Sequence, residues 1–379
     1  MEGEGKKQRT RGGEVDATWP PVGVSHDFCN QPFFKLPIDG ESENSYSVEM
    51  WGDGVIYQKR DLGADQQRRM YLFDLSECVE YLVLGEGNQM SYGHVYDDSV
   101  VVPLCKQCTR DPFRGSDLFG IDARDWQFYQ MTDDTFGYTN PRFNGRYIVS
   151  QQYETLDPSP PPMDLILWDT LTDERVELTS SGSSPGYYAI SDRYAVWSAY
   201  MGLPGSVGKD VAFRDLLTGE TVVIPESLDR YQYAVDVWGN HIIWAGSDSY
   251  VNVPYHLMLY DIDTGEATSL VEGDGIPCFG TIHENLVAWT TLKYRDPEDS
   301  SVRGSDIEMY DIESGTFRRI TTQPSNLGHI RVFHPYLLII DVLNIDRNRN
   351  DWYIANLVEL GVTDSEGNLL SGPPVLDPP

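Results

Sequence analysis

Short runs of apolar and β-branched residues recur along the chain, and each follows a polar turn, most of them containing Gly, Asn or Asp. The seven runs occupy residues 55–58, 100–103, 147–150, 194–197, 241–244, 286–289 and 337–340. Runs of this length and composition between turn-forming residues are typical of strands joined by hairpins, and they disfavour helix. The pattern predicts an all-β chain and excludes a helical solenoid.

A second recurring feature is an Asp at the end of another strand-like run. It occurs at Asp74, Asp122, Asp169, Asp215, Asp261 and Asp311, with spacings of 48, 47, 46, 46 and 50 residues. Repeats of this length belong to propeller blades or helical arrays. After the last two of these positions a turn ending in Gly leads to a further apolar run. Each unit is therefore predicted to be a four-stranded antiparallel blade of a β-propeller.

The seventh unit indicates how the blades close into a ring. One four-stranded sheet exposes two apolar faces, whereas seven sheets stacked around an axis bury both faces of each. The last unit lacks an outer strand, because prolines near the C-terminus prevent pairing there. Residues 33–38 are predicted to complete this blade. We expect a flexible segment at residues 1–30, a single seven-bladed β-propeller at residues 31–362 and a Pro-rich tail at residues 363–379.

The repeat resembles that of TolB-like β-propellers. The resemblance is clearest in the stretches HLMLYDIDTG (residues 256–265) and DIEMYDIESG (residues 306–315), and it covers residues 46–357. It departs from the family pattern in the second unit, at residues 103–108. The resemblance implies the same fold as the periodicity. It also implies a protein-binding module of the bacterial envelope or a surface lipoprotein domain, whereas related scaffolds include peptidase-associated propellers and polysaccharide lyases.

The charge balance limits the classes of partner. The chain carries 59 acidic and 28 basic residues, for a formal net charge of −31. Such a surface repels nucleic acid and anionic lipid, so binding to either through a basic face is disfavoured. No window has the run of about 20 apolar residues that crosses a bilayer. No apolar segment follows the basic cluster at residues 6–11, so a signal peptide is not recognisable.

The first functional hypothesis is a non-catalytic module that binds a protein or peptide at one mouth of the channel. The nucleophile elbow, phosphate-binding loop, dinucleotide fingerprint and zinc-protease motif are all absent, so no catalytic residue is assigned. The long loops at residues 157–163, 201–209 and 295–305 would rim one face. The residues expected at the channel mouth are Tyr92, His94, Tyr138, Tyr188, Tyr233 and His329. From the resemblance we expect a monomer without a cofactor that is periplasmic, cell-surface or secreted.

Two alternatives remain open. The first is a polysaccharide-active, lyase-like enzyme with a divalent cation in the axial channel. It would require several ligands converging on the axis, and His94 and His329 are the histidines expected to face it. The second is a structural surface protein of a salt-tolerant organism, which the acidic, lysine-poor composition favours.

Metal and cysteine chemistry has weak candidates. Asp346, Asn348, Asn350 and Asp351 alternate like the ligands of a calcium loop, although Leu357 stands where an EF-hand requires Glu. An ordinary polar loop is the favoured interpretation. Cys105 and Cys108 have the spacing of a small-loop disulfide or of half a zinc site. In an exported protein Cys29 and Cys78 could also pair.

Overall fold

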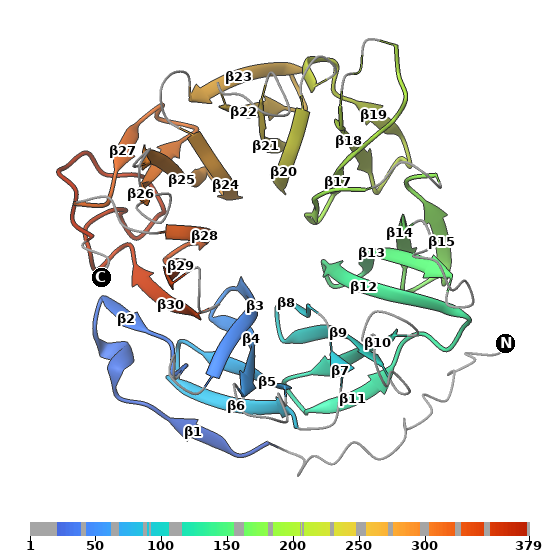
Figure 1. The fold of residues 1–379 in the computed structure, drawn as a ribbon, viewed down its shortest axis with the longest axis horizontal. Coiled ribbons are helices and arrows are strands. Elements are labelled where there is room, and N and C mark those ends of the chain that lie inside the picture. Colours follow the sequence, from blue (N-terminus) through green and yellow to red (C-terminus); the bar gives the residue numbers. More distant parts are fainter. Residues whose placement is uncertain are drawn as a thin grey trace, which may run out of the picture.

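The computed structural model describes residues 21–38, 43–61, 68–85, 89–90, 92–105, 116–154, 163–180, 185–204, 206, 208–227, 231–247, 255–271, 276–295, 303–322, 327–344 and 349–376. Their strands form seven antiparallel sheets arranged in a ring (Figure 1). Six sheets hold the four strands of a blade, and blade 1 carries an additional fifth strand. The prediction of a seven-bladed β-propeller is confirmed. None of the helices in these residues has the length and apolar character needed to cross a membrane.

The first three blades follow the chain order from the innermost strand outward. Blade 1 comprises β3 (Glu43–Trp51), β4 (Gly54–Asp61), β5 (Arg68–Asp74) and β6 (Val79–Leu84). Blade 2 has a divided inner strand and comprises β7 (Gln89–Met90), β8 (His94–Tyr96), β9 (Ser99–Cys105), β10 (Ser116–Asp122) and β11 (Gln127–Gln130). Blade 3 comprises β12 (Phe136–Phe143), β13 (Tyr147–Glu154), β14 (Asp164–Asp169) and β15 (Glu174–Glu177).

The next three blades repeat this arrangement. Blade 4 comprises β16 (Tyr188–Ile190), β17 (Tyr194–Ala199), β18 (Asp210–Asp215) and β19 (Thr221–Val223), followed by the short 3₁₀ helix η2 (Pro225–Ser227). Blade 5 comprises β20 (Tyr231–Trp238), β21 (His241–Ser247), β22 (Tyr255–Asp261) and β23 (Glu266–Val271). Blade 6 comprises β24 (Ile276–His283), β25 (Leu286–Arg295), β26 (Arg303–Asp311) and β27 (Phe317–Arg319).

Blade 7 closes the ring with both ends of the chain. It comprises β28 (Leu327–Phe333), β29 (Tyr336–Asn344), β30 (Arg349–Asn356) and, as its outer strand, β2 (Phe33–Lys35). Phe34 pairs with Ile354 in antiparallel register. The prediction that the N-terminal segment completes the last blade is confirmed.

The N-terminal segment extends this closure onto blade 1. The strand β1 (Gly23–Ser25) pairs with β6 at the outer edge of blade 1, and the 3₁₀ helix η1 (Phe28–Asn30) lies between β1 and β2. Residues 23–30 belong to the segment that the sequence predicts to be flexible. A disulfide joins Cys29 to Cys78, in the turn between β5 and β6, as the sequence allowed for an exported protein. Residues 23–35 therefore form a strap across blades 1 and 7.

The recurring Asp is explained by the chemistry of the turn that follows each third strand. The Oδ1 atom of Asp215 accepts hydrogen bonds from the backbone N–H groups of Leu217 and Thr218, at 2.8 and 3.2 Å. Asp311 accepts one from the N–H of Ser314 at 2.8 Å. In both turns the closing glycine has a positive φ, +76° at Gly219 and +67° at Gly315. The side chain thus fixes the turn, and glycine adopts the backbone conformation that other residues adopt at a cost.

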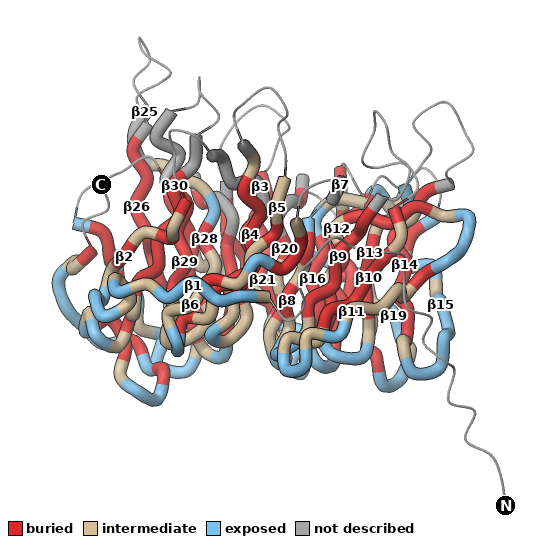
Figure 2. The backbone as a smooth tube through the Cα atoms, turned by 90° about the horizontal axis from the view of Figure 1, so that it is seen from below, coloured by how far each residue is buried: buried red, intermediate tan, exposed pale blue. Residues whose placement is uncertain are grey.

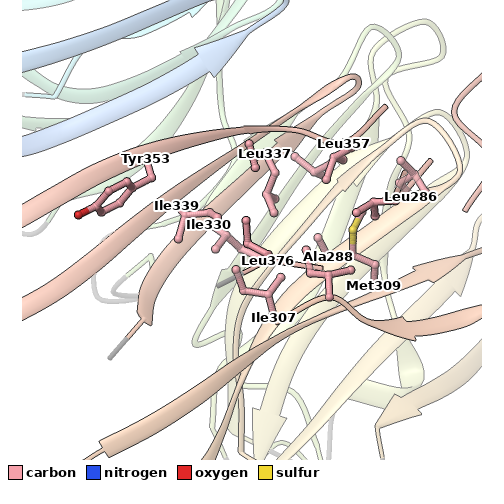
Figure 3. Packing of buried hydrophobic residues seen from close by; sticks show 14 of the residues in the cluster. Leu286, Ala288, Ile307, Met309, Ile330, Leu337, Ile339, Tyr353, Leu357 and Leu376 are labelled. Carbon is pink, nitrogen blue, oxygen red and sulfur yellow. The ribbon is translucent and has the colours of Figure 1, made fainter. Parts of the chain in front are cut away.

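Apolar side chains fill the spaces between adjacent blades. Figure 3 shows one such cluster, to which Leu286 and Met309 of blade 6 and Leu337 and Ile339 of blade 7 contribute. Figure 2 shows that the strands are largely buried, whereas the turns along one edge of the ring are exposed. Each blade therefore buries both of its faces, as the architecture requires.

The Pro-rich C-terminal segment packs on blade 6. The Arg318 side chain, which is 4% exposed, donates hydrogen bonds to the carbonyl oxygens of Gly361, Leu370 and Pro373 at 2.8, 2.9 and 2.8 Å. Leu376 is buried, and its backbone N–H donates to the carbonyl of Ile320. The Pro-rich segment is therefore held on blade 6, because the Arg318 side chain donates the hydrogen bonds that attach it.

Candidate functional site

The inner strands surround a cavity of about 480 Å³ on the ring axis. All seven blades contribute to its lining, and the charged and polar members include Glu49, Tyr92, Asn140, Arg142, His329 and Arg331. These charged and polar lining residues distinguish the cavity from the apolar spaces between blades. Convergent polar groups in a concave site are the usual signature of ligand binding.

Irregular pairing between the inner and second strands positions these side chains on the cavity lining. The inner strands of blades 1, 3, 5, 6 and 7 each show a register shift against the second strand. In blade 3 the shift lies between Thr139 and Arg142, and Asn140 has a φ of +51°. A bulge of this kind changes the direction of the neighbouring side chains and is common beside functional sites. The bulge in blade 3 lies at the level where Asn140 and Arg142 line the cavity.

A carboxylate bridges two guanidinium groups in this cavity. Glu49 Oε1 lies 2.8 Å from Arg142 Nη2, and its Oε2 lies 3.3 Å from Arg331 Nε. Burial alone would raise the pKa of Glu49, but the two arginines lower it to about 2. Asp236 lies nearby, and burial raises its pKa, although Arg331 and the backbone N–H of Ile282 act in the opposite direction. The cavity therefore holds two cationic side chains, Arg142 and Arg331, which the Glu49 carboxylate bridges.

Replacing Glu49 with Gln is expected to lower the free energy of unfolding by about 2 kcal/mol. The change leaves two enclosed cations without their shared anion, although water in the cavity reduces the cost below that of a fully dry ion pair. Urea denaturation measures the loss. The exposed Glu220, changed to Gln, is the matched control and should shift stability by less than about 0.5 kcal/mol. Equal stability of the two variants would contradict the bridging role of Glu49.

Two histidines beside this ion pair remain neutral at pH 7. Burial, reinforced by Arg142, lowers the pKa of His94 to about 3, and burial with Arg331 lowers that of His329 to about 4. The Nδ1 atom of His94 accepts a hydrogen bond from the backbone N–H of Phe143 at 3.2 Å, so this nitrogen is used within the fold. His329 lines the cavity. Of the two, His329 is therefore placed to meet a ligand.

Acid is expected to destabilise the fold at pH values well above those at which its carboxylates are protonated. His94, His283 and His329 have pKa values of about 3, 3 and 4 in the folded chain, whereas the unfolded value is 6.5. The unfolded chain therefore binds more protons below pH 6.5, and stability is lost as the pH falls from there towards 4. The three histidines together should remove about 3 kcal/mol between pH 6 and pH 5. Denaturant titrations at both pH values measure this, and unchanged stability would contradict it.

Three buried polar atoms of the lining residues have no hydrogen-bond partner among the residues that the structure describes. They are Arg142 Nη1, Asn140 Oδ1 and Trp352 Nε1. The other polar groups of Asn140 are used, because its Nδ2 donates to Gln151 and its carbonyl accepts from the Tyr188 hydroxyl at 2.6 Å. Buried polar groups are normally paired. Two open donors and one open acceptor around a cavity therefore indicate a polar ligand.

Aromatic side chains close the axis at one end of the cavity. They are the last residues of the inner strands in six blades, namely Trp51, Tyr96, Phe143, Trp238, His283 and Phe333, and we call them the aromatic floor. The ring centroids of Trp51 and Trp238 lie 5.4 Å apart. These residues belong to blades 1 and 5, on opposite sides of the ring, so their contact occupies the axis (Figure 1). The cavity is thus blind and is entered from the other face.

The structure separates the residues that the sequence placed at the channel mouth. Tyr92, Tyr188 and His329 line the cavity. His94 lies directly behind it, next to Arg142. Tyr138 lies elsewhere, because its ring is buried between blades and its hydroxyl donates to Asp134 at 2.7 Å. The side chain of Tyr233 lies outside the described residues.

The metal and thiol candidates receive little structural support. Asp351 pairs with Lys35 of the closing strand at 2.6 Å, whereas Asp346, Asn348 and the side chain of Asn350 lie outside the described residues. Cys108 and the side chain of Cys105 also lie outside them. Within the part of the chain that the structure describes, no three His, Cys, Asp or Glu residues are grouped to hold a metal ion. The two guanidinium groups on the axis also disfavour a divalent cation there.

The predicted site residues do not include Glu49, Asn140, Arg142, Arg331 and Trp352. Four of them lie on inner strands, and Trp352 lies on the third strand of blade 7. None belongs to a recognised motif. The available signal was charge at unexpected positions. Arginine and glutamate within otherwise strand-like segments on the axis are uncommon unless they are paired.

No family model matches the chain, and no curated protein matches its sequence. Solved structures share the fold. The propeller domain of the Trilobed protease from Pyrococcus furiosus is 13% identical, with a TM-score of 0.60, and the match covers 89% of this chain and 100% of that one. An oligogalacturonate lyase in complex with manganese is also 13% identical, with a TM-score of 0.56, and coverage of 89% and 97%. Pyrococcus horikoshii acylaminoacyl peptidase is 12% identical, with a TM-score of 0.56, and the match covers 79% of this chain and 49% of the peptidase.

These similarities establish the seven-bladed propeller fold. They contradict the expectation of a non-catalytic protein- or peptide-binding module, because the similar structures are a lyase and propellers of peptidases and hydrolases. The enclosed, charged cavity agrees with this correction.

Proposed function

We propose that this protein is a polysaccharide-active, lyase-like enzyme that acts on a carboxylate-bearing saccharide in the axial cavity. The observation that carries the proposal is the Arg142 guanidinium. One of its terminal nitrogens bonds Glu49, while the other is buried on the cavity lining and has no partner within the described ranges. A guanidinium in this state suits a carboxylate. The oligogalacturonate lyase that shares the fold acts, by its name, on such a saccharide.

The remaining open groups suit the hydroxyls of a sugar. Asn140 Oδ1 can accept a hydrogen bond from a hydroxyl, and Trp352 Nε1 can donate one to an oxygen. Tyr92 and Tyr187 at the cavity wall are 44% and 45% exposed, and each offers an aromatic face with a polar tip. A uronate residue presents one carboxylate, several hydroxyls and an apolar ring face, and it matches this set.

The lining residues can support β-elimination on a uronate. A base removes the proton on the carbon next to the carboxylate, the bond from the adjacent carbon to the glycosidic oxygen breaks, and a carbon–carbon double bond forms while the leaving oxygen gains a proton. Arg142 would stabilise the charge that develops on the carboxylate. His329, neutral at pH 7, is assigned the role of base. A bound carboxylate would raise its low pKa and bring it closer to the working pH.

Tyr187 is assigned the role of proton donor to the leaving oxygen. Burial raises the pKa of its phenol, so it stays protonated near neutrality. It lines the same cavity as His329. The described residues do not fit a divalent cation, so no step is assigned to one.

The test is incubation with oligogalacturonates in the presence of a chelator. The double bond conjugated with the carboxylate absorbs ultraviolet light, and its absorbance should rise with time. Galactose oligomers, which lack the carboxylate, are the matched control and should give no product. Failure to bind or cleave any acidic saccharide, or peptide hydrolysis at the same cavity, would overturn the proposal.

We also infer that the protein works outside the reducing cytoplasm. The support is the disulfide between Cys29 and Cys78, because such bonds persist in oxidising compartments. Thiol labelling of protein from fractionated cells tests this, and free Cys29 and Cys78 thiols in the native protein would contradict it.

A further inference from the structure

A lysine lies beside the cavity where its wall meets blade 4. The position is fixed by Gly186, which lines the cavity: a Cβ at this position would lie 3.0 Å from Lys209 Nζ. The same Cβ would meet Ser198 Oγ at 2.6 Å, so these two side chains fill the space that a side chain at residue 186 would need. Lys209, which directly precedes β18 of blade 4, is thus at the cavity edge.

The Lys209 ammonium is partly desolvated and has no ion-pair partner within the described residues. Burial lowers its pKa, and its Nζ lies 5.8 Å from the ring centroid of Tyr200. The next residue, Asp210, is fully buried, and burial raises the pKa of its carboxyl. Successive residues of an extended chain point to opposite faces, so Asp210 does not neutralise the lysine at the cavity edge.

An exposed aromatic ring lies near this ammonium. It belongs to Tyr200, which is 45% exposed, and Tyr187, the residue after Gly186, is exposed to the same extent. The backbone that carries them is held by paired hydrogen bonds, from Gly186 N to Ser198 O and from Ser198 N to Tyr187 O, at 2.7 and 2.9 Å. A cation beside an exposed ring, next to a rigid strand pair, suits an anionic sugar.

The aromatic floor determines which way a longer ligand must leave. Because Trp51 and Trp238 occupy the axis, a saccharide whose acidic residue binds Arg142 cannot pass through the ring. Its remaining residues have to leave through the mouth. Gly186 is the lining residue without a side chain on blade 4, and Lys209 lies directly beyond it.

We propose that this mouth is a second subsite for an acidic saccharide, in which Lys209 binds the carboxylate of the next uronate and Tyr200 contacts its sugar ring. The subsite rests on the proposed function, because it extends the same ligand. It implies a preference for oligouronates over single uronates. It also implies that the chain enters the cavity end first.

The experiment compares affinity for galacturonate and trigalacturonate by isothermal titration calorimetry. Lys209→Met is expected to weaken trisaccharide binding about tenfold, the effect of one charge-assisted hydrogen bond, and to leave monosaccharide binding unchanged. Lys209→Arg should restore most of the affinity. Arg214→Met, near the other end of β18, is the matched control and should have no effect on either ligand.

Each outcome decides a separate question. Equal weakening of both ligands by Lys209→Met, or no weakening of the trisaccharide, would overturn the second subsite while leaving the cavity site intact. Absence of binding of either saccharide to the unmodified protein would overturn the proposed function itself. Circular dichroism of each variant shows that a loss of affinity comes from the site and not from the fold.

Discussion

Arg142→Met is expected to reduce affinity for oligogalacturonate about a hundredfold and to abolish turnover. The substitution removes the buried Nη1 donor, which has no partner among the described residues, and a hydrogen bond to a charged group is worth about 1.5 to 3 kcal/mol. Arg142→Lys should recover part of the affinity, because a point charge cannot reproduce the planar fork. Binding is measured by calorimetry and turnover by ultraviolet absorbance.

Arg146→Met is the matched control for this prediction. Arg146 belongs to the same blade but pairs with Asp169 on the outer turn, away from the axis. The control variant should bind as the unmodified protein does. If Arg142→Met retained full affinity, the carboxylate would have to bind elsewhere, and the assignment of the axial cavity would be wrong.

Loss of the disulfide between Cys29 and Cys78 is expected to lower the free energy of unfolding by about 3 kcal/mol. The bond attaches the strap of residues 23–35 to blade 1, while β2 pairs with blade 7, so it restrains the closure of the whole ring. Its loop spans 49 residues, and disulfides of this kind contribute about 2 to 4 kcal/mol. Denaturation of the doubly substituted variant, with both cysteines changed to Ser, measures the loss.

Measurement in reducing buffer is the control for the disulfide prediction. In reducing buffer the unmodified protein should fall to the stability of the doubly substituted variant, because both then lack the bond. A variant that matches the oxidised protein in stability would show that the strap is held by β1 and β2 pairing alone.

The fold could be predicted because its signals are local and repeated. Asp215 and Asp311 recur since each fixes the same turn, and the short apolar runs recur since each second strand is buried on both faces. The closing strand followed from counting strands in the last unit. Ring closure therefore required no knowledge of contacts far apart in the sequence.

The site could be predicted only in part because the inner strands are irregular. The aromatic residues of the first strands predicted Tyr138 at the channel mouth, but Tyr138 lies in the space between blades. The bulge at Asn140 changes the register of the strand beyond it. A shift of one residue reverses the face of every following side chain. Arg142 lies beyond this bulge, so regular alternation along the strand does not indicate which face its side chain occupies.

The aromatic floor had a signal in the sequence that was not used. An aromatic residue or histidine directly precedes the polar turn after the inner strand in six units, as at Trp51, Tyr96 and Trp238. This pattern can be interpreted only with the ring of blades, because residues nearly two hundred positions apart meet only once the blades are closed around one axis. A periodic pattern of this kind becomes a prediction of a blind cavity when it is read together with the propeller.

A crystal structure of the protein with trigalacturonate tests the central claim most directly. The account predicts one uronate carboxylate within hydrogen-bonding distance of Arg142 Nη1, above the aromatic floor, and the next residues leaving past Gly186 over blade 4. A saccharide bound on the far side of Trp51 and Trp238, or at the outer edges of the blades with the axial cavity empty, would contradict it.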